Sequence, residues 1–217
     1  MVICVPVTTL FSLFVANVIR KQHPVVTAIF RACFYFPAIT ASAVLAVTWK
    51  LIYNPTNGVL NWFLGLFGME PVLWLANTDV VLPALAVIVV TWQVVYPIIM
   101  FCTGLDGIPN TYMEAASMDG ASKLRIFWQI IIPLLKPTTL YVIVTTTIGS
   151  FQTFAVVQLL TAGGPNYATS TVMYQLYETA FKYGKLGLAS AMGVVLATLI
   201  GIVAIFQFKL LSDDVEY

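Results

Sequence analysis

Long apolar stretches separated by short polar intervals dominate this chain. A bilayer span needs about 20 mostly apolar residues. Five stretches meet that requirement, at about residues 1–19, 34–53, 80–103, 138–160 and 186–208. The pattern predicts an all-α fold: a polytopic membrane helical bundle of about five transmembrane helices, forming a single domain over residues 1–217.

The polar interval at about 104–137 has a structured pattern of its own. Pro109 and Asn110 are typical of a helix start, with Asn110 as the expected cap. Gly120 is expected to end this helix in the left-handed conformation. Ser122 is placed to cap a second helix, which Pro133 helps to close. The interval is therefore predicted to form two short helices joined at a glycine elbow.

The residues of this elbow resemble the EAA loop of permeases from ATP-binding-cassette (ABC) importers. The matching positions are Glu114, Ala115, Ala116, Asp119, Gly120, Ala121, Phe127, Ile130 and Pro133. The resemblance implies a cytoplasmic loop that couples the membrane helices to separate ATPase subunits. Small alanines would let the helix enter a cleft, and Glu114 and Asp119 would pair with basic groups or cap N–H groups. The alternative from spacing alone is an ordinary helical hairpin between spans.

A second motif indicates which subfamily of these permeases the chain resembles. The run from Leu160 to Pro165, followed by Ala168 and Thr169, is similar to one in the first permease subunit of carbohydrate importers of the maltose and glycerol-3-phosphate type. Ala162 stands where that family has a glycine. The resemblance implies four partners: a second homologous permease, two ABC ATPase subunits and an extracytoplasmic sugar-binding protein. It also implies one more span before residue 1, so the chain is expected to correspond to the later part of such a permease.

Charge predicts the orientation in a bacterial cell membrane. By the positive-inside rule, the side richer in Lys and Arg is cytoplasmic. In a five-span arrangement one side carries Arg20, Lys21, Arg31, Lys123, Arg125, Lys136 and Lys209, and the other carries Lys50, Lys182 and Lys185. The elbow is therefore expected in the cytoplasm and residues 54–79 and 161–185 outside. Trp49, Tyr53, Trp62 and Trp74 suit an outer aromatic belt.

Composition excludes several classes of function. The chain is 60% hydrophobic and 9% charged, with a net charge of +1 and a mean hydropathy of +0.93, which places it outside the soluble globular class. No basic patch is available for nucleic acid. Three scattered cysteines and one histidine do not form a metal-ligand pattern. Because no catalytic set or phosphate-binding loop is visible, we expect no enzyme activity and no bound cofactor, with ATP and Mg²⁺ held by partner subunits.

Polar residues within the apolar stretches indicate a candidate substrate path. Such residues are costly in lipid and often mark a route through the bundle. The candidates are Trp92, Gln93, Tyr96, Gln152, Phe154 and Gln158. Aromatic faces and amides suit sugars, although hydrogen bonding between helices is an alternative role. The alternative substrate is a non-sugar solute such as glycerol-3-phosphate. The lack of carboxylates within the spans disfavours a stand-alone secondary transporter. A membrane enzyme would predict a polar catalytic cluster, and a purely structural scaffold would predict no requirement for the elbow.

Overall fold

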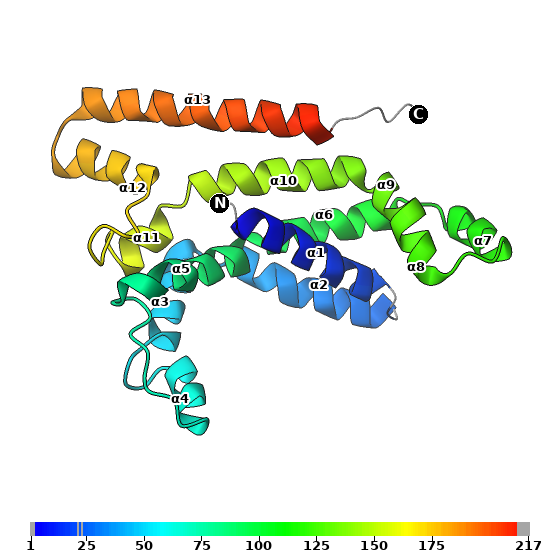
Figure 1. The fold of residues 1–217 in the computed structure, drawn as a ribbon, viewed down its shortest axis with the longest axis horizontal. Helices are drawn as coiled ribbons and strands as arrows, with labels where there is room; N and C mark the ends of the chain where they lie inside the picture. Colours follow the sequence, from blue (N-terminus) through cyan, green and yellow to red (C-terminus); the bar gives the residue numbers. More distant parts are fainter. Residues whose placement is uncertain (1–2, 21, 23, 212–217) are drawn as a thin grey trace. The chain divides into compact units, whose positions relative to one another are not determined.

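The computed structural model describes residues 3–20, 22 and 24–211. The described residues contain helices and no strands, so the predicted all-α fold is confirmed. The elements, labelled in Figure 1, are α1 (Cys4–Arg20), α2 (Pro24–Ile39), α3 (Ser42–Ile52), α4 (Val59–Leu66), α5 (Thr78–Gln93), α6 (Val95–Asp106), α7 (Asn110–Met118), α8 (Lys123–Ile126), the π-helix η1 (Phe127–Ile131), α9 (Ile132–Leu134), α10 (Lys136–Phe151), α11 (Ala155–Leu160), α12 (Val172–Tyr177), the π-helix η2 (Glu178–Lys182) and α13 (Leu186–Leu211).

The chain divides into two compact units, each built from separate segments. The first unit comprises 39–92 and 149–201, and the second comprises the described residues of 2–38, 93–148 and 202–217. The chain therefore passes from one unit to the other near residues 38, 92, 148 and 201. Each unit has its own core of buried apolar side chains.

In the second unit, α1 packs along α6 (Figure 1), and the buried side of α1 carries a stripe of small residues. Thr8, Ser12 and Ala16 recur every four residues, and all are 0% exposed. Small side chains at this spacing let two helix backbones approach closely in a membrane. The Ser12 hydroxyl donates to the Thr8 carbonyl at 2.6 Å and lies 3.4 Å from the Val94 carbonyl at the start of α6. The stripe thus fixes α1 against the beginning of α6.

A second close approach in this unit joins α6 to α10. A Cβ atom at Gly104 would lie 2.8 Å from Thr138 Oγ1 and 3.0 Å from Leu135 Cδ2. A side chain at position 104 would therefore have to displace Thr138 or Leu135. Further along α10, Thr147 Oγ1 accepts a 2.8 Å hydrogen bond from Gln207 Nε2 of α13. These contacts hold the two ends of α10.

In the first unit, α3 packs against α11 around a buried tyrosine. Tyr53 is 3% exposed, and its ring lies between Trp49 and Trp74 at centroid distances of 5.1 and 5.6 Å. Its hydroxyl donates to the Ala84 carbonyl of α5 at 3.0 Å. Tyr53 is therefore a core residue, which corrects its assignment to an outer aromatic belt.

The predicted spans correspond to helices of unequal length. Within the described residues, α13 is the one continuous helix long and apolar enough to cross a membrane, over Leu186–Leu210. Two pairs of helices pass the same test when each pair is treated as one span. One pair is α5 with α6. The other is the helical stretch Lys123–Leu134 with α10, and these two helices meet at a bend of 65°. Helices α1 and α3 are apolar and shorter. The predicted range 34–53 falls on α2 and α3, and α2 begins earlier, at Pro24.

Candidate functional site

The candidate coupling loop begins at α7, directly after Pro109. The sequence predicts Asn110 as the cap of this helix, but Asn110 is the first helical residue, and Pro109 occupies the cap position without a side-chain hydrogen bond. The Asn110 side chain instead accepts from Arg20 Nη2 at 3.5 Å, and the same nitrogen lies 3.5 Å from the Ile108 carbonyl. Arg20 at the end of α1 therefore holds the point where the loop leaves α6.

The glycine elbow has the predicted local geometry. Gly120 has a φ of 78°, which places it in the left-handed region. The N–H groups of Asp119, Gly120 and Ala121 donate back to the carbonyls of Ala115, Ser117 and Ala116 at 3.1, 3.1 and 2.9 Å. These bonds satisfy carbonyls that would otherwise be free at the end of α7. A Cβ on Gly120 would meet nothing within 4 Å, so backbone conformation alone requires glycine here.

The second helix of the loop is capped and anchored. Ser122 Oγ accepts from the Arg125 N–H at 3.3 Å, as predicted. The helix continues through the π-turn of η1 into α9, and π-turns occur often at functional sites. Its inward side is buried in the core of the second unit, where Phe127 also packs. The buried residues are Ile126, Ile131 and Leu135. Pro133 is exposed.

The remaining loop residues divide between an exposed and a packed side. Glu114, Ala115, Asp119 and Gly120 are exposed, and α7 has no buried residue. Ala116 and Ala121 are half-buried against the core of the second unit. A groove of about 310 Å³ lies between the two helices of the loop, lined by Ala116, Asp119, Ala121, Arg125, Ile126, Gln129 and Ile130.

Several large apolar side chains of the loop are also exposed, and sequence reasoning missed them. Met118 is 89% exposed beside the elbow, and Tyr112 is 54% exposed on the same helix. Leu124 and Trp128 are exposed on the second helix. An apolar residue in the polar setting of α7 is the signal that could have identified Met118. Exposed apolar groups of this kind mark a contact surface.

The candidate substrate-path residues lie at breaks in the membrane helices. Trp92, Gln93 and Tyr96 surround the break at Val94, where α5 ends and α6 begins. Pro97 has no N–H to donate to the Gln93 carbonyl, which favours a break there. Trp92 and Gln93 are half-buried, and Tyr96 is 66% exposed.

The second break separates α10 from α11 at residues 152–154. Gln152 is exposed there, while Phe154 and Gln158 are half-buried. The Phe154 ring lies 4.6 Å from that of Tyr177. Trp92, Gln152, Phe154 and Gln158 belong to the first unit, and Gln93 and Tyr96 belong to the second. Irregular backbone at membrane depth is found where it lines a cavity or is buried in protein.

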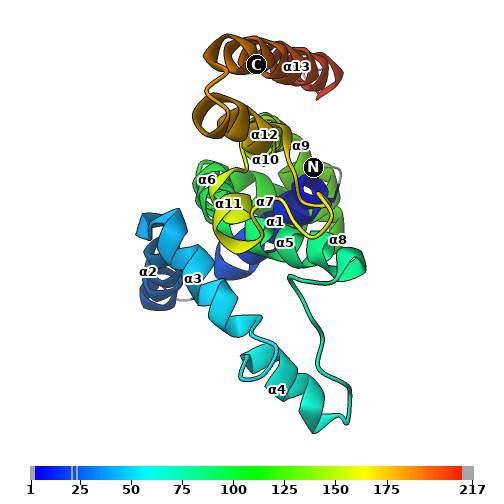
Figure 2. The ribbon, with the colours of Figure 1, turned by 90° about the vertical axis from the view of Figure 1, so that its left-hand side faces the viewer.

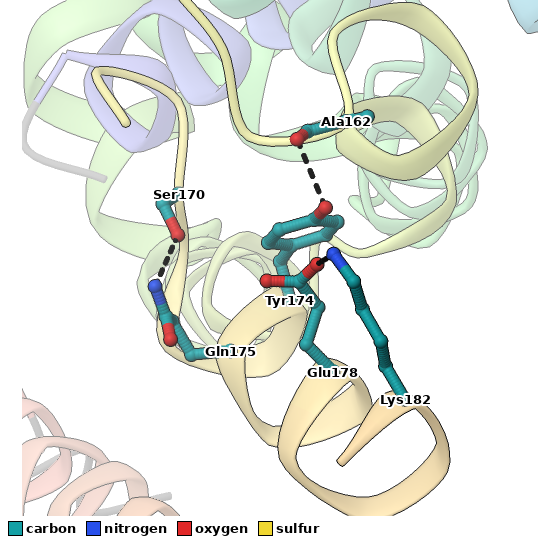
Figure 3. Close-up of polar contacts among 6 residues, drawn as sticks. All are labelled: Ala162, Ser170, Tyr174, Gln175, Glu178 and Lys182. Atoms are coloured by element: carbon teal, nitrogen blue, oxygen red, sulfur yellow. Dashed lines mark hydrogen bonds and ion pairs between the residues drawn. The ribbon is translucent and has the colours of Figure 1, made fainter. Parts of the chain in front are cut away.

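A polar network joins α12 and η2 to the loop that follows α11 (Figure 3). The Tyr174 hydroxyl donates to the Ala162 carbonyl at 2.9 Å, and Gln175 Nε2 donates to Ser170 Oγ at 2.8 Å. Lys182 Nζ donates to Glu178 Oε1 at 2.6 Å, and this bond lowers the pKa of the Glu178 carboxyl. Burial, and then the neighbouring Glu178 carboxylate, raises the pKa of Tyr174.

Comparison with known proteins identifies the family. The pattern described as "Binding-protein-dependent transport system inner membrane component" matches residues 8–217. The chain belongs to this family. It is an inner membrane permease component of a binding-protein-dependent transport system. The fold, the sequence relatives and the structural neighbours below agree with this assignment.

Two relatives show the extent of the match. The chain is 36% identical over 217 residues to the probable ABC transporter permease protein YesP of Bacillus subtilis (strain 168), covering 98% of this chain and 69% of that protein. It is 35% identical over 193 residues to the sn-glycerol-3-phosphate transport system permease protein UgpA of Agrobacterium fabrum, covering 87% of this chain and 64% of that protein. The chain thus spans about two thirds of the length of these relatives.

The fold also matches a solved structure. A chain from a bacterial ABC transporter involved in import of the acidic polysaccharide alginate superposes with a TM-score of 0.85. The match covers 99% of this chain and 74% of that one, at 18% sequence identity. A chain of the alginate transporter in complex with its alginate-pentasaccharide-bound periplasmic protein gives a TM-score of 0.78. At this identity, the likeness establishes the fold.

Proposed function

We propose that the chain is the permease subunit of an ATP-driven carbohydrate importer and forms half of the pathway across the membrane. The elbow at Gly120 is the observation that carries this proposal. It presents an exposed helix on one side and is anchored in the core of the second unit on the other. A hairpin that only joined two helices would not need exposed Met118 and Tyr112.

In this proposal, α7 docks on an ATPase subunit and transmits its movement. Glu114 and Asp119 are exposed and pair with basic groups of the ATPase, while Ala115 allows close approach. Ala116, Ala121 and Phe127 link the elbow to the core of the second unit. Pro133 is expected from the sequence to close the second helix, but it lies within α9, and the helix continues to Leu134 before α10 begins. Movement of α7 therefore reaches α6 and α10, the helices that flank the loop.

The substrate proposal rests on the chemistry at the two helix breaks. Trp92, Gln93, Tyr96, Gln152, Phe154 and Gln158 offer aromatic faces and amides, and these six side chains carry no charge. Sugars present C–H faces and hydroxyl groups that suit such side chains. A phosphate ester would call for Arg or Lys, which bind phosphate by charge-assisted hydrogen bonds. We therefore favour a neutral sugar or oligosaccharide over glycerol-3-phosphate.

The proposal extends to partners and location. The chain crosses the bacterial cell membrane several times, with the elbow in the cytoplasm. It works with a second homologous permease, two ABC ATPase subunits and an extracytoplasmic sugar-binding protein. ATP and Mg²⁺ are bound by the ATPases, and this chain carries out no covalent chemistry. The described residues contain no group of three or more His, Cys, Asp or Glu able to hold a metal ion.

The experiment is uptake by the complete transporter in proteoliposomes, with ATP inside and binding protein outside. We expect ATP-dependent uptake of a neutral oligosaccharide. Gln152→Leu should raise the substrate concentration for half-maximal uptake, while Gln22→Leu, an exposed change between α1 and α2, should not. Selective uptake of glycerol-3-phosphate would contradict the substrate class. Failure of an ATPase to co-purify with the chain would contradict the proposed assembly.

A further inference from the structure

Helix α4 presents a large apolar face that the transport proposal does not use. Between Lys50 and Glu70 the sequence contains no charged residue. Large apolar side chains in and just after α4 are each more than half exposed: Val59, Trp62, Phe63, Leu66, Phe67 and Met69. Figure 2 shows α4 at the end of a hairpin that extends beyond α3, within the same unit. A face of this size requires a partner.

The opposite side of α4 is fixed by one buried asparagine. Asn61 is 6% exposed. Its Nδ2 donates to the carbonyls of Pro55 at 3.1 Å and Val72 at 3.0 Å. Its Oδ1 accepts from the Val72 N–H at 3.1 Å and from Trp74 Nε1 at 2.9 Å. The segments before and after α4 are thus bound to one side of the helix. The apolar face therefore lies on the side of α4 that points away from these two segments.

The polar turn before α4 completes an amphipathic unit. Asn54 Oδ1 accepts from the N–H groups of Thr56 and Asn57, each at 3.0 Å. Both residues are exposed and line a hollow of about 360 Å³ beside Trp62. The polar turn is therefore suited to water, whereas the apolar face of α4 is suited to hydrocarbon.

Exposed apolar side chains are also present on the preceding helix. Val44, Val47 and Leu51 are exposed on α3 at a helical spacing, and α3 belongs to the apolar helices of this inner membrane protein. By contrast, Trp49 and Trp74 each pack against the ring of Tyr53 and contribute to packing within the unit. Among the four aromatic residues expected in an outer belt, Trp62 alone is more than half exposed.

We propose that α4 is an interfacial helix that lies on the outer lipid leaflet, with Trp62, Phe63 and Leu66 at the boundary between headgroups and acyl chains. Helices with a wide apolar face bind at this depth, and Trp is enriched there. Because α4 carries no basic residue, its binding needs no anionic lipid. The helix holds the outer ends of α3 and α5 at a fixed depth, independently of the ATPase.

A docking site for the binding protein is the competing use of this face. Such a protein must dissociate in every cycle, which would leave six large apolar side chains in water. Interfaces of transient complexes are about as polar as the rest of a protein surface. The absence of charge from residues 51–69 is therefore better matched by lipid, which stays in place throughout the cycle.

The test is spin labelling of the full chain in its complex, in nanodiscs of phosphatidylcholine with or without phosphatidylglycerol. The labels replace Phe63 and, as a matched control on the polar turn, Asn57. The background carries Cys4→Ala, Cys33→Ala and Cys102→Ala, which removes the three native thiols. Collision rates with oxygen, which concentrates in lipid, and with a water-soluble nickel chelate are then compared at each site.

We expect the ratio of oxygen to nickel collisions to be several-fold higher at Phe63→Cys than at Asn57→Cys, and equal in the two lipid mixtures. High nickel accessibility at position 63 that falls when binding protein is added would overturn the proposal in favour of protein docking. High nickel accessibility that does not change would overturn it as well. Neither result depends on ATP-driven uptake, so this test and that of the transport proposal can fail separately.

Discussion

The hydroxyl of Tyr174 donates a 2.9 Å hydrogen bond to the carbonyl of Ala162, a residue with a left-handed backbone (φ 46°) (Figure 3). The ring of the same tyrosine lies against Gly163, where a Cβ would come within 2.8 Å of Tyr174 Cε1. A single side chain thus holds a strained residue and excludes any side chain from its neighbour. This contact organises the loop between α11 and α12.

Replacing Tyr174 by Phe should loosen this loop. The change removes the donor to Ala162 and should cost about 1 kcal/mol, the usual net value of one hydrogen bond. Amide hydrogen exchange over residues 161–171 should accelerate, while the protection of α10 stays the same. Tyr167→Phe is the matched control, because Tyr167 is 79% exposed. Equal exchange in both variants would show that the hydroxyl does not hold the loop.

Replacing Ala162 by Gly should stabilise the protein. A left-handed backbone costs a residue with a Cβ about 1–2 kcal/mol, whereas glycine adopts it freely. Part of this gain is offset by the greater freedom of glycine in the unfolded chain, so an increase of up to about 1 kcal/mol is expected. Thermal unfolding in detergent measures it. A lower unfolding temperature would mean that the methyl group has a packing role that outweighs the strain.

The Glu178–Lys182 pair should make this region sensitive to acid. The bond from Lys182 lowers the pKa of Glu178 below its ordinary value of 4.5. A carboxyl with a depressed pKa contributes stability above its ordinary pKa and loses it as the pH falls through the folded-state value. Both residues belong to η2, so protection of η2 should stay constant down to about pH 5 and decrease below 4.5. Glu178→Gln should remove this acid-dependent step, and an unchanged profile in the variant would assign the step to another group.

Enlarging Gly104 should disrupt the contact between α6 and α10. Gly104→Leu must displace Thr138 and Leu135 and should cost about 1–3 kcal/mol. Gly104→Ala should be milder, and Thr138→Ala should partly rescue it because it removes the Oγ1 atom that a Cβ would meet at 2.8 Å. Thermal unfolding of Gly104→Leu, Gly104→Ala, Thr138→Ala and the double variant Gly104→Ala/Thr138→Ala tests this. Strictly additive effects would show that the two residues do not interact.

Local rules predict the elbow of the coupling loop and the start of its second helix, but not the start of α7. Gly120 in the left-handed region and Ser122 as a cap both follow from short-range backbone chemistry. Asn110 fails as a cap because Pro109 already occupies that position, and a contact with Arg20, 90 residues away along the chain, engages its side chain. This contact depends on the packing of α1, so the residues next to Asn110 in the sequence do not predict it.

The membrane helices are predictable only in part. A hydropathy pattern reports the average polarity of a stretch and carries no information about breaks in a helix. It therefore does not predict the interruptions at Val94 and at residues 152–154. Pro97 is the available signal for the first, since it removes the N–H that the Gln93 carbonyl would accept. The burial of Tyr53 also escapes sequence reasoning, because it depends on Trp74 and Ala84, which are distant in sequence.

The measurement that tests the coupling role of the elbow most directly is the number of substrate molecules imported per ATP hydrolysed in Gly120→Val and Gly120→Asn transporters. Gly120 is required for its φ of 78° alone, since a Cβ at this position would meet no atom within 4 Å. Valine is excluded from this conformation, whereas asparagine tolerates it. We predict that the valine variant reaches the membrane but loses coupled import, while the asparagine variant retains it. Import by Gly120→Val at the wild-type ratio would contradict the coupling role.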